Sequence, residues 1–190
     1  MINSRDINLL KPYVKYLAEQ FIIKCKESGL NVLITSTVRD DEYQSTLYAQ
    51  GRTKPGSIVT NSSVVGPHGY GLAFDFCQNV KGNEYPASFM KSAGAIGKSL
   101  GLEWGGDWKS FPDTPHLQYV QGLTTSQIRA GALPKFPPIP SKPAENVNVK
   151  AYKEIIQAKL KFSDPSGVWI LMDQHKNAEE MYRKWSASYK

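Results

Sequence analysis

The sequence predicts an α+β domain over residues 1–133, followed by a Pro-rich linker and a small helical module. Three observations support this division. Apolar residues recur at helical spacing near the start, three later segments look like strands, and the composition changes sharply near residue 133. The chain of 190 residues is long enough for one well-cored domain and a small appendage. Hydrophobic residues make up 41% and charged residues 21%, as in soluble globular proteins rather than disordered ones.

Helices are predicted where apolar residues recur every three or four positions, or where start and stop signals flank a segment. The predicted helical segments are 7–21, 40–50 and 88–100, and Gly29 marks the end of the first helix. A further short helix is predicted after Thr124, which forms a capping box with Gln127. Strands are predicted where β-branched residues gather or apolar residues alternate, at 31–37, 72–77 and 116–120. Residues 52–67 have no periodicity. They predict a long surface loop of the kind that is often functional, with Arg52 as its anchor.

The end of the chain differs in composition from the rest. Residues 133–143 contain five prolines, which predicts a semi-rigid linker over 134–144. Residues 145–190 predict two amphipathic helices with a turn at 164–167. Two helices bury little surface alone, so this module either packs on the first domain or binds a partner.

Charge and targeting patterns limit the possible partners. The net charge of +6 suits an anionic partner, but the basic residues are scattered and form no patch typical of nucleic-acid binding. No apolar stretch approaches the roughly 18 residues of a membrane span, and the N-terminus lacks a signal-peptide pattern. We therefore expect a protein that is made in the cytosol and does not insert into a membrane. We also expect it to be a monomer. Cys25 and Cys77 match no metal or redox spacing and are expected to be reduced core residues.

Two of the three histidines lie in segments rich in Gly, Pro and Asp. His68 precedes Asp75 by seven residues, and Asp113 precedes His116 by three. Two imidazoles and one carboxylate are a common ligand set for a catalytic zinc ion, and a second carboxylate can act as general base. The alternative is that these histidines are ordinary hydrogen-bonded residues and the aspartates cap turns, because the spacing alone is not specific. His175 has no ligand pattern nearby and is interpreted as nonfunctional.

Five segments between residues 35 and 119 resemble, in the same order, the signatures of the VanY-like D-alanyl-D-alanine carboxypeptidases and L-alanyl-D-glutamate endopeptidases. They are HGYGLAFD at 68–75, DTPH at 113–116, STVR at 36–39, LYAQGRTKPG at 47–56 and WGGDW at 104–108. Gly66 and Leu117 depart from the signatures, which have Ser and an aromatic residue there. Neither is a ligand position, so the departures concern packing and substrate contacts.

The resemblance implies a fold like that of Hedgehog and the D-Ala-D-Ala peptidases, with a small, mainly antiparallel sheet and helices on one side. It implies one Zn²⁺ ion, held by His68, Asp75 and His116 at the mouth of a cleft. Asp113 corresponds to the family's general base.

Further roles follow from what the chemistry requires. Arg39 is assigned to stabilise the negative charge on the carbonyl oxygen, with a substrate carboxylate or a structural partner as the alternative. Ser36 and Gln44 are expected either to orient substrate or to face solvent. Trp104 and Trp108 are candidates for the cleft floor or for the core.

The preferred activity is hydrolysis of the L-alanyl-D-glutamate bond in the peptidoglycan stem peptide, with D-alanyl-D-alanine carboxypeptidase and a noncatalytic wall-binding module as alternatives. The segment at 47–56, the missing signal peptide and the trailing module favour a phage endolysin. Such an enzyme is made in the host cytoplasm and reaches the wall after release. Basic and aromatic residues in 145–190 could bind an anionic wall polymer, or could form the module's own core.

Overall fold

The computed structural model describes residues 1–140 and Arg183. The chain divides into two units, Met1–Ile139 and Pro140–Lys190. The predicted helical module over 145–190 and the end of the predicted linker lie outside the described residues, apart from Arg183, which is helical. The first unit contains all of the strands that the structure describes.

A four-stranded sheet lies at the centre of this unit, and every neighbouring pair of its strands is antiparallel. Its order is β1 (Val32–Ser36), β2 (Ala73–Gln78), β4 (His116–Gln118) and β3 (Glu103–Trp104). The predicted α+β class and antiparallel pairing are therefore confirmed. Strand β3 was not predicted, because two residues are too few to carry an alternating pattern.

The two faces of the sheet have different roles, because successive side chains on a strand point to opposite faces. The pair Phe74 and Leu117 and the pair Ile34 and Phe76 face the hydrophobic core. Asp75 pairs with His116 on the other face, and Glu103 pairs with Gln118 there. The register of the sheet thus separates an apolar face from a face that bears the chemistry.

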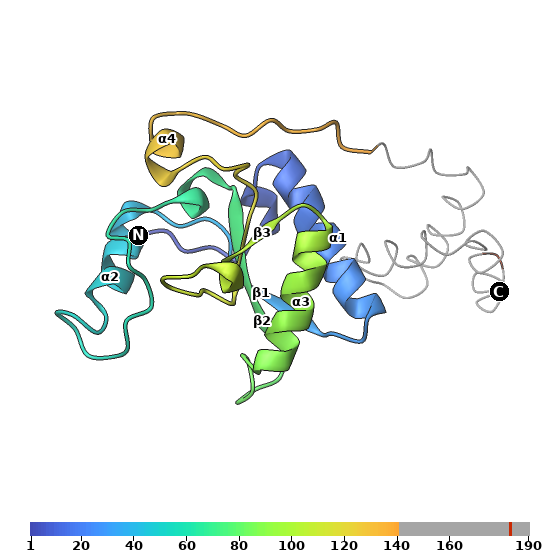
Figure 1. Cartoon of the computed structure of the whole chain (residues 1–190), viewed down its shortest axis with the longest axis horizontal. Coiled ribbons are helices and arrows are strands. Elements are labelled where there is room, and N and C mark those ends of the chain that lie inside the picture. The colour runs from blue at the N-terminus through green and yellow to red at the C-terminus, as the bar shows by residue number, and fades with distance from the viewer. Residues whose placement is uncertain (141–182, 184–190) are drawn as a thin grey trace. The chain divides into compact units, whose positions relative to one another are not determined.

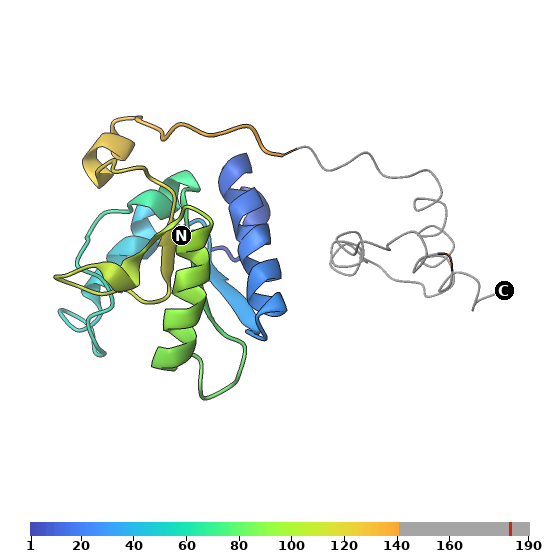
Figure 2. The same ribbon diagram turned by 45° about the vertical axis from the view of Figure 1, so that its right-hand side comes forward.

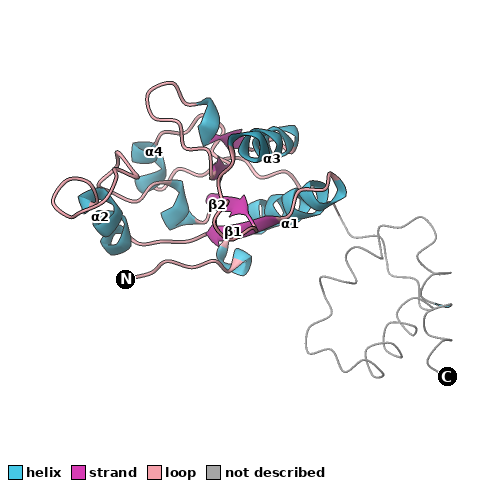
Figure 3. Ribbon diagram, turned by 90° about the horizontal axis from the view of Figure 1, so that it is seen from below, coloured by secondary structure: helices cyan, strands magenta, loops and turns pink. Residues whose placement is uncertain are grey.

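Helices α1 (Pro12–Glu27) and α3 (Ala87–Ser99) lie side by side and cover the apolar face (Figures 1 and 2). The Phe21 ring of α1 lies 5.7 Å from the ring of Phe74 and 5.0 Å from that of Phe76. Helices α2 (Asp41–Ala49) and α4 (Thr125–Arg129) lie on the opposite side of the sheet from that pair (Figure 3), so helices flank both sides of the sheet and not one side as expected. Asp40 caps α2, and Thr124 with Gln127 forms the predicted capping box of α4.

The first predicted helix is divided in the structure. A 3-10 turn, η1 (Ile7–Leu9), is capped by Asp6, and α1 begins only at Pro12. Proline has no N–H group to donate and a fixed φ angle, so it suits the first position of a helix and not the interior. The apolar periodicity continues across the break because both pieces pack on the same core.

Three further expectations can be compared with the described residues. Cys25 and Cys77 are both buried and free, as predicted, and burial raises the pKa of the Cys25 thiol to about 12. Phe136, in the Pro-rich segment, stacks on Tyr119, so this part of the segment packs on the domain. Within the described part of the chain, the helices are too short or too polar to span a membrane.

Candidate metal centre

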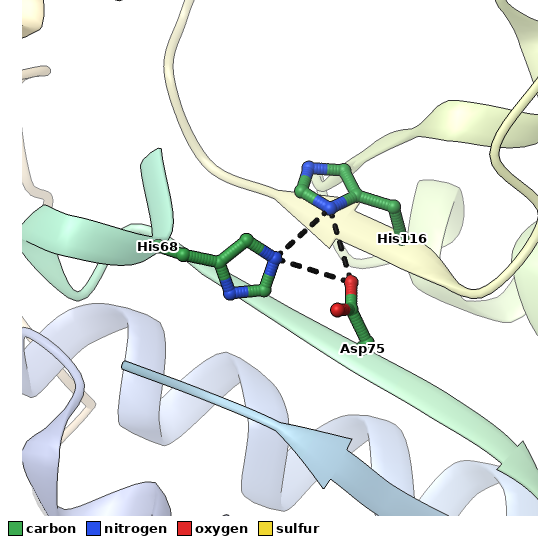
Figure 4. A group of neighbouring side chains, drawn as sticks. All are labelled: His68, Asp75 and His116. Atoms are coloured by element: carbon green, nitrogen blue, oxygen red, sulfur yellow. Dashed lines mark hydrogen bonds and ion pairs between the residues drawn. The ribbon is translucent and has the colours of Figure 1, made fainter. Parts of the chain in front are cut away.

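Three side chains converge on the polar face of the sheet, as Figure 4 shows. His68 comes from the 3-10 turn η2 (Pro67–Tyr70), Asp75 from β2 and His116 from β4. The His68 Nε2 atom lies 3.1 Å from Asp75 Oδ1 and 3.2 Å from His116 Nδ1, and Asp75 Oδ1 lies 3.1 Å from His116 Nδ1. Residues 48 positions apart in sequence thus place three potential ligand atoms in one small triangle.

The outer nitrogen of each ring is already used by a hydrogen bond. His68 Nδ1 donates to the Thr37 carbonyl oxygen over 2.6 Å, and His116 Nε2 donates to Gln118 Oε1 over 3.0 Å. In a neutral imidazole the other nitrogen then carries a lone pair. Two lone pairs and an anionic oxygen can face one another at these distances only if a cation lies among them, either a proton or a metal ion.

The triangle has the size that zinc requires. Tetrahedral coordination with bonds of about 2.0–2.1 Å separates neighbouring ligand atoms by roughly 3.3 Å. The observed separations of 3.1–3.2 Å are close to this value. Two nitrogens and one carboxylate oxygen leave a fourth position open, as in catalytic rather than structural zinc sites.

The electrostatics of the three groups are strongly linked. Burial alone would raise the pKa of Asp75, but the two neighbouring histidines outweigh it and hold that pKa well below its usual range. Burial lowers the pKa of His68, and this effect exceeds the opposite effect of Asp75, whose charge and hydrogen bond raise that pKa. Burial also acts to lower the pKa of His116, but hydrogen bonding to Asp75 and the charges of Asp75 and Asp113 raise it overall. The two histidines therefore differ, because the pKa of His68 is lowered and that of His116 is raised.

Asp113 lines the same cleft as His68 and His116. Burial raises the pKa of its carboxyl group, and the charge of Asp75 adds to the effect. Its backbone is fixed on both sides, because its N–H donates to the Gly105 carbonyl and its own carbonyl accepts the His116 N–H. The Trp104 indole also holds this loop by donating to the Thr114 carbonyl over 2.8 Å. Trp104 is thus a support for the loop.

Gly105 explains why the WGGDW segment lies against the DTPH segment. A Cβ atom at Gly105 would lie 2.5 Å from the Asp113 carbonyl oxygen and 3.1 Å from His116 Cβ. We expect Gly105→Ala to displace both residues and reduce kcat/KM by about 10²-fold, because misplacement by about 1 Å can have that effect. Steady-state kinetics together with a thermal melt measure this. A variant that keeps wild-type kinetics would show that the close approach is not required.

Arg39 lies beside the cluster and also lines the cleft. Its Nη1 atom is 3.3 Å from Asp75 Oδ2, the carboxylate oxygen that does not face the histidines. The Nε–H group is buried, with no hydrogen-bond partner among the described residues. A buried donor without a partner is energetically costly.

The cleft has a volume of about 570 Å³, and the loop after α2 forms one wall. Gln44 is buried, lines the cleft and donates to Thr60 Oγ1 and to the Ser62 carbonyl, both in this loop. Arg52 donates to the Tyr48 and Thr60 carbonyls and to Asn61 Oδ1, so its predicted role as loop anchor is confirmed.

Two other predicted residues have clear positions. The Trp108 ring packs 5.1 Å from the His116 ring, is 38% exposed and lines the cleft. The Ser36 hydroxyl is buried and donates to Asn3 Oδ1 over 3.1 Å, and Ser36 is not among the residues that line the cleft. A role in orienting substrate stays a prediction for both Ser36 and Gln44.

Sequence reasoning did not identify Thr37, Gln118 or Glu103. Gln118 had a usable signal, because it lies two residues after His116 on a predicted strand and so shares its face. Thr37 binds His68 through its backbone carbonyl group. Every residue has this group, so the residue type at position 37 gave no signal. Glu103 becomes relevant only through pairing of β3 with β4.

Together, the mixed nitrogen and oxygen ligand set, the adjacent carboxylate and the open cleft define the site as that of a metal-dependent hydrolase. Comparison with known proteins agrees. A family model described as D-alanyl-D-alanine carboxypeptidase matches residues 60–119. The chain is 40% identical over 123 residues to the peptidoglycan L-alanyl-D-glutamate endopeptidase CwlK of Bacillus subtilis, covering 58% of this chain and 74% of that protein.

The chain is also 32% identical over 151 residues to the L-alanyl-D-glutamate peptidase of Listeria phage A118, covering 77% of this chain but only 50% of that protein. Among solved structures, the Serratia marcescens L-Ala D-Glu endopeptidase ChiX matches with a TM-score of 0.47 and 18% identity, over 67% of this chain and 92% of ChiX. The family assignment rests on the sequence relatives. The chain belongs to the VanY-like family of peptidases.

Proposed function

We propose that the chain hydrolyses the L-alanyl-D-glutamate bond of the peptidoglycan stem peptide with one zinc ion held by His68, Asp75 and His116. The observation that carries this proposal is the triangle of three ligand atoms, each about 3.1–3.2 Å from the others, on the wall of an open cleft. When bound, zinc polarises a carbonyl group and lowers the pKa of water to about 7.

Asp113 is the proposed general base. Amide hydrolysis needs a group that accepts a proton from the attacking water and passes it to the leaving amine. A carboxylate whose pKa is raised by burial suits both steps, because it binds the proton more readily than an exposed carboxylate and can still release it. Its position in the cleft, next to His116 in the backbone hydrogen-bond pattern, supports this role.

Arg39 is proposed to stabilise the negative charge that develops on the carbonyl oxygen. A fixed donor that is already in place when this charge forms gives the largest benefit. The cleft-lining position of Arg39 supports this role. The ion pair with Asp75 fixes the guanidinium group next to the ligands.

The relatives support the choice of bond. CwlK and the Listeria phage protein are both named for L-alanyl-D-glutamate cleavage. That one of them is a phage protein supports a role as an endolysin that acts on the cell wall, and the net charge of +6 suits an anionic wall. The proposal concerns the first unit, and wall binding by residues 145–190 stays a prediction.

The family model's description favours a second candidate, a D-alanyl-D-alanine carboxypeptidase. The two activities leave different products. Cleavage of the L-alanyl-D-glutamate bond leaves a new N-terminal D-glutamate, whereas the carboxypeptidase releases free D-alanine.

We therefore expect digestion of purified walls by the zinc-loaded chain to generate new N-terminal D-glutamate without free D-alanine. Labelling of free amines followed by mass spectrometry distinguishes these products, with chelator-treated protein as the control. Free D-alanine as the only product would assign the carboxypeptidase activity instead. Wall binding without either product would indicate a noncatalytic binding module.

A further inference from the structure

A short relay of side chains leads from one metal-site histidine to the edge of the sheet. His116 Nε2 donates to Gln118 Oε1 over 3.0 Å, and Gln118 Nε2 donates to Glu103 Oε2 over 3.0 Å. The other oxygen of Glu103 accepts the Gly122 N–H over 3.3 Å. Gln118 is only 9% exposed, and its side chain lies between the histidine and the glutamate.

The sheet register brings these three residues together. Glu103 of β3 lies directly opposite Gln118 of β4. His116 lies two positions before Gln118 on the same strand and therefore on the same face. Each link of the relay is thus a same-face neighbour on one strand or a cross-strand pair, so the backbone places the side chains within reach of each other.

The relay has a direction, because its members differ in what they can donate. An ionised carboxylate only accepts hydrogen bonds, so Glu103 requires the NH₂ end of the Gln118 amide to face it. The Gln118 amide oxygen then faces His116, and an amide oxygen can only accept a hydrogen bond. His116 must therefore carry its proton on Nε2, and its lone pair lies on Nδ1, the atom in the ligand triangle.

The opposite amide orientation would change the site. With the Gln118 NH₂ group toward His116, Nε2 would have to accept, and the proton would move to Nδ1, where it blocks metal binding. His68 needs no such device, because its Nδ1 donates to the Thr37 backbone carbonyl, which only accepts. His116 is the histidine whose tautomer depends on side chains.

We propose that Glu103 and Gln118 are positioning residues that hold His116 in the tautomer able to bind zinc and thereby set the affinity of the site for the metal. This inference rests on the proposed function, because it assumes that the triangle holds zinc. Outer hydrogen-bond partners of metal ligands fix the tautomer and ring orientation, and their loss typically costs 10- to 100-fold in affinity.

Three variants test the direction of the relay. Glu103→Gln lets the residue at 103 donate or accept, so the Gln118 amide is no longer oriented. Gln118→Glu keeps an acceptor for His116 but sets two carboxylates against each other. The double variant Glu103→Gln with Gln118→Glu restores one donor and one acceptor at each link with unchanged total charge.

We expect Glu103→Gln to raise the zinc Kd about 10- to 100-fold. The double variant should recover most of this loss, because the carboxylate at position 118 can only accept from His116. Gln118→Glu alone should keep the His116 tautomer for the same reason. Competition with a chelator measures the Kd. Nitrogen-15 NMR of the metal-free chain at alkaline pH reports the His116 tautomer, which a merely structural role would leave unchanged. Glu84→Gln is the matched control, because Glu84 also accepts a glycine N–H, from Gly82, and is not among the residues that line the cleft.

The outcomes separate this inference from the proposed function. Wild-type zinc affinity and an unchanged tautomer in Glu103→Gln would overturn the relay while leaving the metal site in place. Loss of affinity in Glu103→Gln without recovery in the double variant would also overturn it, because the direction of the hydrogen bonds would not be the cause. A wild-type chain that binds no zinc would overturn the proposed function and the relay together.

Discussion

Replacing Asp113 by Asn is expected to reduce kcat on a soluble stem peptide by about 10²- to 10⁴-fold while the zinc content stays unchanged. Asparagine keeps the shape of the side chain but cannot accept the proton from water. Asp113 is not part of the ligand triangle, so the metal should remain bound. A timed peptide-cleavage assay measures kcat, and metal analysis of the same sample measures the zinc content. Asp113→Ala should behave in the same way.

Asp107→Asn is the matched control for this experiment. Asp107 lies in the same stretch of chain, but its carboxylate pairs with Lys98 and the residue does not line the cleft. Turnover should stay near the wild-type value. If Asp113→Asn cleaves peptide as fast as the wild type, another group accepts the proton and the assignment of Asp113 fails.

Replacing His68 by Ala is expected to remove the bound zinc and abolish activity. The substitution removes one of three ligands and leaves the Thr37 carbonyl without its buried partner. Metal-binding energy is partly folding energy, so the Tm of the loaded wild type should also exceed that of the variant. Metal analysis and thermal melts with and without added zinc measure the effect.

The dependence on zinc provides an internal control. A chelator should lower the Tm of the wild type and leave the Tm of His68→Ala unchanged, because only the wild type has a metal to lose. If the variant retains one zinc ion per chain and its Tm still falls with chelator, His68 is not a ligand. The buried Thr37 carbonyl would then be the main reason for any loss of stability.

Much of the fold could be read from local patterns. The helices α2 and α3 and the strands β1, β2 and β4 fall where periodicity and capping signals predicted them, within about one or two residues at most ends. Such signals depend on neighbours a few positions apart, which the sequence gives directly. The same holds for candidate ligands, because His68, Asp75 and His116 are recognisable from residue type and local context.

The break at Leu10 and the strand β3 show where local patterns fail. The apolar stripe runs from Ile7 into α1 without interruption, yet Pro12 sets the start of the helix. Strand β3 has two residues, and only its pairing with β4 makes it a strand. In both cases a constraint outside the pattern, a missing N–H group or a partner strand, decided the structure.

By itself, the sequence determined which residues of this protein could carry metal and proton chemistry, and where most of the helices and strands lie. Tertiary structure alone decided how these residues meet. It placed His68 Nε2 3.2 Å from His116 Nδ1, although the two residues are 48 positions apart in the sequence. It also left the Arg39 Nε–H without a partner among the described residues, and it set Glu103 opposite Gln118. The physical reason is that side-chain type and local spacing belong to the chain, whereas register between strands depends on global packing. A slip of one residue in a strand would turn its side chains to the other face.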